Sequence, residues 1–153
     1  MLEFRLFGTG HAHYDGQLLS GFPRQQSYQL LCYLLLNRRH PHHRERLAAV
    51  FWGEAPTDTS RKYLRNSLWR LRQNLELAGL PVGEYLSISD DCVSWITSSR
   101  YWLDVEAFEA ALTGVQHLPP EALGPAQVTM LEQALDLYAG DLLEGIYDDW
   151  CLY

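Results

Sequence analysis

The stretch that decides the fold is TDTSRKYLRNSLWRLRQNLEL, residues 57–77. Its leucines recur at steps of four, three and four, which places them on one face of an α-helix. These residues are Leu64, Leu68, Leu71 and Leu75. At about 100° per residue, the side chains opposite the leucines are cations, amides and one tryptophan. We expect one long amphipathic helix whose outer face is basic.

Composition places the chain among ordinary globular proteins. A length of 153 residues allows one domain, or one domain with an appendage, and 47% of the residues are apolar. No apolar run approaches the roughly 18 residues that cross a bilayer, and the start MLEFRLFG lacks the pattern of a signal peptide. Three distant cysteines, with no CxxC pair, fit a reducing compartment. We expect a cytoplasmic protein with no membrane partner.

Charge is unevenly distributed along the chain. Residues 1–77 hold 11 Lys and Arg against 6 Asp and Glu, a balance of +5. Residues 78–153 hold 1 against 13, a balance of −12, and the two balances give the net charge of −7. Such asymmetry indicates a nucleic-acid-binding part joined to a part with another role.

The first 20 residues predict a small antiparallel sheet. Leu2, Phe4 and Leu6 alternate with other residues over Met1–Phe7, which is typical of a strand with one core face; Phe7 breaks the alternation. His11–Tyr14 and Gln17–Leu19 flank an Asp-Gly pair that favours a hairpin turn.

Two shorter helices precede the basic one. Apolar periodicity predicts helices over Arg24–Asn37, with Pro23 in the first turn, and over Arg44–Phe51, ended by Trp52-Gly53. Residues 37–43 contain a proline and are expected to form a loop. Either Thr57 or Asp58 is suited to cap the basic helix.

A hairpin and two more helices are predicted after the basic helix. Residues 84–89 and 92–96 alternate around the polar tip Asp90-Asp91 and read as paired strands. Helices are expected over 105–115 and 126–138, separated by the proline-rich loop 116–125.

The quoted stretches resemble a known family. LFG near the start, LLCYLLLNRR, RERLAAVFWG and RKYLRNSLWRLRQNLE are similar to the OmpR-type winged-helix DNA-binding domain, and the match is closer to the SARP branch of transcriptional activators. WLDVEAFEAAL and LEQALDLYAGDLLEGIYDDWC resemble the bacterial transcriptional activator domain that follows it. The expected fold class is α+β: a winged helix over 1–98, then over 99–153 the truncated start of an all-α, tetratricopeptide-like region.

The resemblance implies a transcriptional regulator, more specifically an activator, that binds double-stranded promoter DNA sequence-specifically. The helix at 57–77 would lie in the major groove and the hairpin would be the wing. The loop 53–58 would contact RNA polymerase, as in related regulators. The family also suggests homodimers on direct repeats, although nothing in the sequence specifies an interface. No cofactor is implied.

Geometry on the predicted helix selects the residues expected to contact DNA. Amides and arginines there can read base edges, and cations can reach phosphates. The predicted contact residues are Arg61, Lys62, Arg65, Asn66, Trp69, Arg70 and Gln73. Trp69 either contacts DNA or packs against the wing, whereas Arg72 lies near the leucine stripe and is expected to serve the fold. The tip of the hairpin departs from the family pattern, since the carboxylates of Asp90 and Asp91 would repel phosphates. Either the hairpin stays off the DNA backbone or binding is weaker than is usual in the family.

Other classes of function have weaker support. The segment His40-Pro41-His42-His43 and the pair His11 and His13 could ligate zinc, but no cysteine pair accompanies them, so solvated histidines explain them better. No nucleophile elbow, P-loop or HExxH motif is present, and we expect no enzymatic activity. The main alternative is a protein-interaction module whose basic helix binds an acidic partner or the acidic half of the chain itself.

Overall fold

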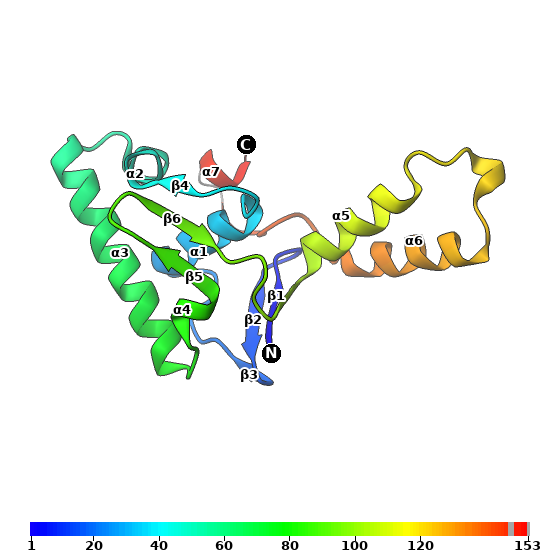
Figure 1. The fold of residues 1–153 in the computed structure, drawn as a ribbon, viewed down its shortest axis with the longest axis horizontal. Helices are drawn as coiled ribbons and strands as arrows, with labels where there is room; N and C mark the ends of the chain where they lie inside the picture. The colour runs from blue at the N-terminus through cyan, green and yellow to red at the C-terminus, as the bar shows by residue number, and fades with distance from the viewer. Residues whose placement is uncertain (147–148, 153) are drawn as a thin grey trace. The chain divides into compact units, whose positions relative to one another are not determined.

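The computed structural model describes residues 1–146 and 149–152 and shows a mixed α+β fold (Figure 1). The chain forms two compact units. The first contains Met1–Leu18 and Tyr101–Ile146, and the second contains Leu19–Arg100 and Tyr147–Tyr153. The N-terminal strands therefore group with the segment after residue 100. These units are defined by their compactness. The assignment of residues 1–98 and 99–153 to separate domains remains a prediction.

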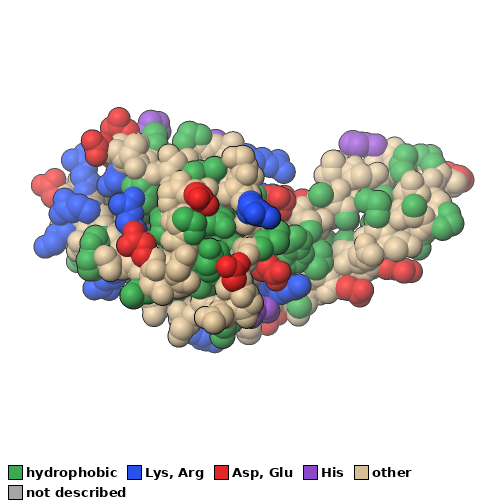
Figure 2. Space-filling view, turned by 60° about the horizontal axis from the view of Figure 1, so that its bottom comes forward, with side chains coloured by type: hydrophobic (Ala, Val, Ile, Leu, Met, Phe, Trp, Pro, Cys, Tyr) green, Lys and Arg blue, Asp and Glu red, His purple; other side chains and the backbone are tan. Residues whose placement is uncertain are grey.

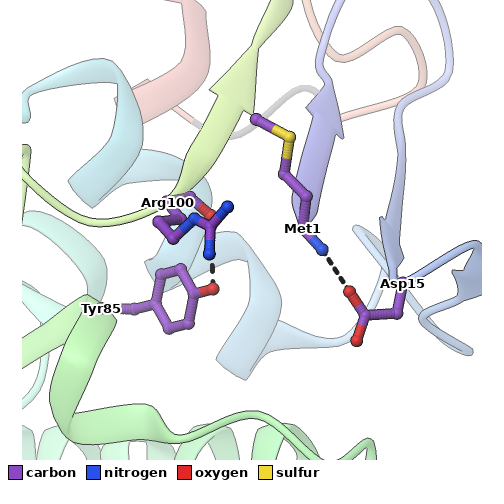
Figure 3. Close-up of polar contacts among 4 residues, drawn as sticks. All are labelled: Met1, Asp15, Tyr85 and Arg100. Carbon is purple, nitrogen blue, oxygen red and sulfur yellow. Dashed lines mark hydrogen bonds and ion pairs between the residues drawn. The ribbon is translucent and has the colours of Figure 1, made fainter.

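A four-stranded sheet organises the first unit, in the order β3-β2-β1-β7. Its strands are β1 (Leu2–Arg5), β2 (His11–Tyr14), β3 (Gln17–Leu18) and β7 (Tyr101–Leu103). The predicted N-terminal sheet is confirmed, with Leu2, Phe4 and Leu6 fully buried. Positive φ at Asp15 and Gly16, 50° and 84°, makes the tight hairpin turn. Figure 3 shows Asp15 beside the terminal amine of Met1, with which it forms an ion pair.

Strand β7 was not predicted. It pairs with β1 in parallel, with Leu2 opposite Tyr101 and Phe4 opposite Leu103. Three residues carry too short a pattern to indicate a strand by themselves.

Two antiparallel helices follow β7, as predicted. They are α5 (Asp104–Val115) and α6 (Pro125–Leu137), and a short 3-10 turn, η1 (Pro120–Ala122), lies in the loop between them (Figure 1). Ala134 and Val115 are buried, but Leu112, Met130 and Leu135 are exposed. The hairpin thus presents apolar side chains to solvent. Its relation to tetratricopeptide helices remains a prediction.

The segment after α6 returns to the first strand. Gly8 N–H donates to Asp141 O at 2.8 Å, and Leu143 N–H donates to Leu6 O at 2.7 Å. Phe7, which broke the strand alternation, packs its ring against Phe108 and Tyr138 at centroid distances of 5.4 and 5.1 Å. Its apparent irregularity in the sequence therefore reflects a second apolar contact.

The three longest helices of the second unit agree with prediction. They are α1 (Gln26–Leu36), α2 (Arg44–Trp52) and α3 (Thr57–Leu77). The four leucines of the α3 stripe are at most 5% exposed, and Leu30, Leu31, Leu34, Leu35 and Leu47 pack with no exposure. Two details of the predicted helix starts are wrong. Pro23 lies outside α1, and the capping position of α3 is Pro56, so Thr57 and Asp58 are already helical.

A three-stranded sheet completes the second unit, in the order β4-β6-β5. The predicted hairpin is confirmed as β5 (Leu86–Ile88) and β6 (Cys92–Trp95). Two expectations need correction. Glu84 and Tyr85 belong to a short helix, α4 (Val82–Tyr85), and the expected loop 37–43 contains β4 (His42–His43), which pairs with β6. The Tyr85 hydroxyl donates to the Arg100 carbonyl at 3.3 Å (Figure 3).

A short helix, α7 (Asp149–Leu152), lies in the same unit. The ring of Trp150 packs against Phe51 and Tyr33, at centroid distances of 5.3 and 6.2 Å. Within residues 1–146 and 149–152, no helix is both long and apolar enough to cross a membrane.

Candidate nucleic-acid interface

The outer face of α3 is solvent-exposed over its length. Every residue predicted to contact DNA is exposed: Arg61, Lys62, Arg65, Asn66, Trp69, Arg70 and Gln73. The leucines on the opposite face are buried against the rest of the unit. Figure 2 shows Lys and Arg side chains gathered at the left of the view, over α3. Burial of the stripe fixes the rotation of the helix, and that rotation presents cations and amides outward.

The turn before α3 depends on one glycine. A Cβ at Gly53 would lie 2.5 Å from the Ala49 carbonyl oxygen, closer than real side chains approach. Gly53 therefore lets the chain leave α2 tightly. Pro56 then precedes the first residue of α3, and Ser60 donates its hydroxyl to the Thr57 carbonyl at 2.9 Å.

One of the predicted cations is already paired. The guanidinium of Arg61 forms an ion pair with Glu45 on α2. Both side chains are largely exposed, so the pair adds little stability. It does reduce the positive charge that Arg61 offers to phosphates.

The structure bears on two expectations about side chains on α3. Trp69 is 62% exposed and makes no aromatic ring contact among the described residues, so the structure offers no support for packing against the hairpin, and DNA contact stays a prediction. Arg72 is also exposed, and the described part of the chain gives it no ion pair, so the structure offers no support for a structural role.

The tip of the β5–β6 hairpin is hydrogen-bonded to the start of α2. The Arg44 N–H donates to the Asp91 carbonyl at 2.9 Å, and the Arg44 guanidinium donates from Nε to the Ser89 carbonyl at 2.8 Å. The tip and the first turns of α3 line a cavity of about 760 Å³, whose walls include Asp90, Asp91, Arg61 and Arg65. The acidic tip therefore lies near the N-terminal cations of α3.

The histidine segment serves the fold. His42 is 4% exposed, and its Nε2 is 2.8 Å from the Asn37 carbonyl oxygen. The expectation of a fully solvated loop is therefore wrong at this residue. His11 and His13 are two residues apart on β2, with ring centroids 5.3 Å apart. In the part of the chain that the structure describes, no group of three His, Cys, Asp or Glu side chains is arranged to hold a metal ion.

A second cavity adjoins α3, and none of its described lining residues belongs to the hairpin. It has a volume of about 510 Å³ and lies between the first turn of α1 and the middle of α3. Sequence reasoning missed the contribution of α1, because only tertiary packing brings these two segments together. Exposed Arg70 lines this cavity, whereas Arg61 and Arg65 line the cavity beside the hairpin tip.

A comparison with solved structures finds the same fold in Mycobacterium tuberculosis EmbR, in a structure of its complex with a low-affinity phosphopeptide. The TM-score is 0.70 at 22% sequence identity, and the match covers 94% of this chain and 37% of the EmbR chain. No family model matches the sequence, and the search of curated proteins found no significant match. At this identity the likeness shows the fold alone, an α+β arrangement with three helices followed by a hairpin.

Proposed function

We propose that this chain is a transcriptional regulator that binds double-stranded DNA sequence-specifically through α3. The observation that carries the proposal is the outer face of α3, where exposed cations and amides follow one another along a helix that is held by its leucine stripe. An α-helix fits the major groove, where Asn and Gln pair with adenine and Arg pairs with guanine.

Particular roles follow from the positions of the side chains. Asn66 and Gln73 are the proposed readers of adenine, and Arg70 the proposed reader of guanine. Lys62 and Arg65 supply contacts to phosphates. Arg61 contributes less, because Glu45 already pairs with it.

The wider role rests on the family resemblance and on the shared fold. We propose that the protein activates transcription, that the turn at 53–58 contacts RNA polymerase, and that two copies bind direct repeats. The chain spans 37% of the EmbR chain it matches, and the phosphopeptide in that structure is a ligand of EmbR. We therefore do not extend phosphopeptide binding to this chain.

Selection of bound sites from a random duplex pool tests binding and specificity together. We expect enrichment of one motif, and an affinity for that motif that falls steeply with salt, because phosphate contacts release counterions. Absence of binding at low salt would refute the proposal.

A protein-interaction module is the second candidate function. The exposed apolar residues of the α5–α6 hairpin, Leu112, Met130 and Leu135, favour it. Under this alternative, the basic face of α3 binds an acidic protein or the acidic half of the chain. Capture of an acidic protein partner, together with no enrichment from the duplex pool, would select it.

A further inference from the structure

The cavity of about 510 Å³ has the chemistry of an anion site. Gln26 and Ser27 line it from the first turn of α1, and Asn66, Ser67 and Arg70 line it from α3. Every lining side chain is uncharged or cationic, since none of the described residues around the cavity is Asp or Glu. A ligand here meets donors from two helices and one guanidinium.

The start of α1 is left without a cap. No side chain of the described residues accepts a hydrogen bond from it, and its first turn contains no acidic residue. The first N–H groups of a helix have no partner within the helix, and those of Gln26 and Ser27 find none elsewhere in the described part of the chain. The N-terminus also carries partial positive charge from the helix dipole, which favours an anion there.

Ser67 provides an independent indication of a ligand. Its side chain is buried, with 7% exposure, and its hydroxyl has no hydrogen-bond partner within residues 1–146 and 149–152. A buried hydroxyl without a partner is unfavourable, and a phosphate oxygen in the cavity would accept its proton. This unsatisfied donor lies on the same wall as Arg70.

The first turn of α1 is also held in place before any ligand binds. Asn74 Nδ2 donates to Gln25 Oε1 at 3.1 Å and to Ser27 Oγ at 3.4 Å, which ties this turn to α3. Gly21, at φ +85°, packs so closely that a Cβ there would lie 2.5 Å from Gln25 Nε2. Fixed donors lose less entropy on binding than mobile ones.

We propose that this cavity binds a phosphodiester of the DNA backbone. The amides of Gln26 and Ser27, the hydroxyl of Ser67 and the guanidinium of Arg70 are its donors. The inference rests on the proposed function, because phosphates border the groove that α3 would occupy. It adds α1 to the interface and converts Arg70 from a reader of guanine alone into a group that also reaches the backbone.

Comparison of Gln26→Pro with Gln26→Ala isolates one of these donors. Gln26 is the first residue of α1, where proline is tolerated, and Gln25 has φ −68° and ψ 139°, the region required before proline. The proline variant therefore loses the amide hydrogen and keeps the helix. We expect it to bind the selected duplex about tenfold more weakly than Gln26→Ala, without a lower melting temperature. Ser67→Ala should also weaken binding and leave stability unchanged or higher.

The outcomes separate this inference from the proposed function. If the wild type binds the duplex and both Gln26→Pro and Ser67→Ala bind it equally well, the phosphate site is refuted and DNA binding stands. If the wild type binds no duplex, both fail. Titration with inorganic phosphate, followed through the NMR signal of the Ser27 amide, distinguishes free phosphate from a DNA phosphodiester as the ligand of the cavity. A saturable shift with unchanged duplex affinity in the variants would assign the cavity to free phosphate and overturn the DNA proposal.

Discussion

The carboxylate of Asp104 accepts two hydrogen bonds from the backbone amide of Leu6, at 2.9 Å to Oδ1 and 3.0 Å to Oδ2, across 98 residues of sequence. It also accepts from Phe7 N–H at 3.0 Å and from Val105 N–H at 2.8 Å. Asp104 is 1% exposed and stands in the first turn of α5, where the helix dipole favours a negative charge. One side chain thus joins the end of β1 to the start of α5.

We expect Asp104→Asn to lower the free energy of unfolding by about 2–4 kcal/mol. The amide keeps one acceptor oxygen, and its NH₂ group would face backbone donors. Urea unfolding measures the change. Asp136→Asn, an exposed position on α6, removes the same charge and should leave the midpoint unchanged. Equal midpoints for the two variants would show that the Asp104 contacts do not stabilise the unit.

Sequence reasoning succeeded where the pattern is local. The bounds of α3 follow from one apolar stripe, and the turn at Asp15-Gly16 follows from two residues. Strands β4 and β7 have two and three residues, and they exist only through pairing with β6 and β1. Such short segments have no periodicity of their own, so only the folded chain reveals them.

The candidate site was predictable to the same extent. A helical wheel identified the exposed face of α3, because burial of the leucines determines it. It did not place Ser67 beside the first turn of α1, and it gave no sign that Glu45 pairs with Arg61. Those relationships depend on how α1 and α2 approach α3.

Lys62→Ala tests phosphate contact by α3. The side chain is exposed, so its removal should not change stability. If Lys62 neutralises one phosphate, the slope of log K against log[salt] should fall by about one. Arg46→Ala makes the same charge change at an exposed position on α2 and serves as the control. Equal slopes in wild type and Lys62→Ala would exclude a phosphate contact at this residue.

Trp69→Ala tests whether this exposed ring binds DNA. Because 62% of the residue is exposed, we expect its loss to change stability by less than about 0.5 kcal/mol. The affinity for the selected duplex should nevertheless fall several-fold. Leu77→Ala removes another exposed apolar side chain from α3, 84% exposed, and should leave affinity unchanged. A clear loss of stability without loss of affinity would instead assign Trp69 to the fold.

The acidic hairpin tip should weaken DNA binding. Asp90 and Asp91 share a cavity with Arg61 and Arg65 and repel phosphates that approach those arginines. We expect the double change Asp90→Asn with Asp91→Asn to strengthen duplex binding several-fold at low salt, and less at high salt because of screening. Glu132→Gln with Asp136→Asn makes the same change in net charge on α6. An equal gain in that control would show that overall charge, and not the tip, is responsible.

His11 should make the first unit less stable in mild acid. Burial, followed by the nearby charges of His13 and Arg5, lowers the pKa of His11 below its ordinary value of 6.5. As pH falls through 6.5, the unfolded chain binds the proton before the folded chain does, so the free energy of unfolding decreases. At pH values well above 6.5 both states are neutral at this residue and the effect disappears. Urea unfolding between pH 5 and pH 7.5 should show this decrease in wild type and a smaller one in His11→Gln. The same pH dependence in both proteins would mean that other groups produce it.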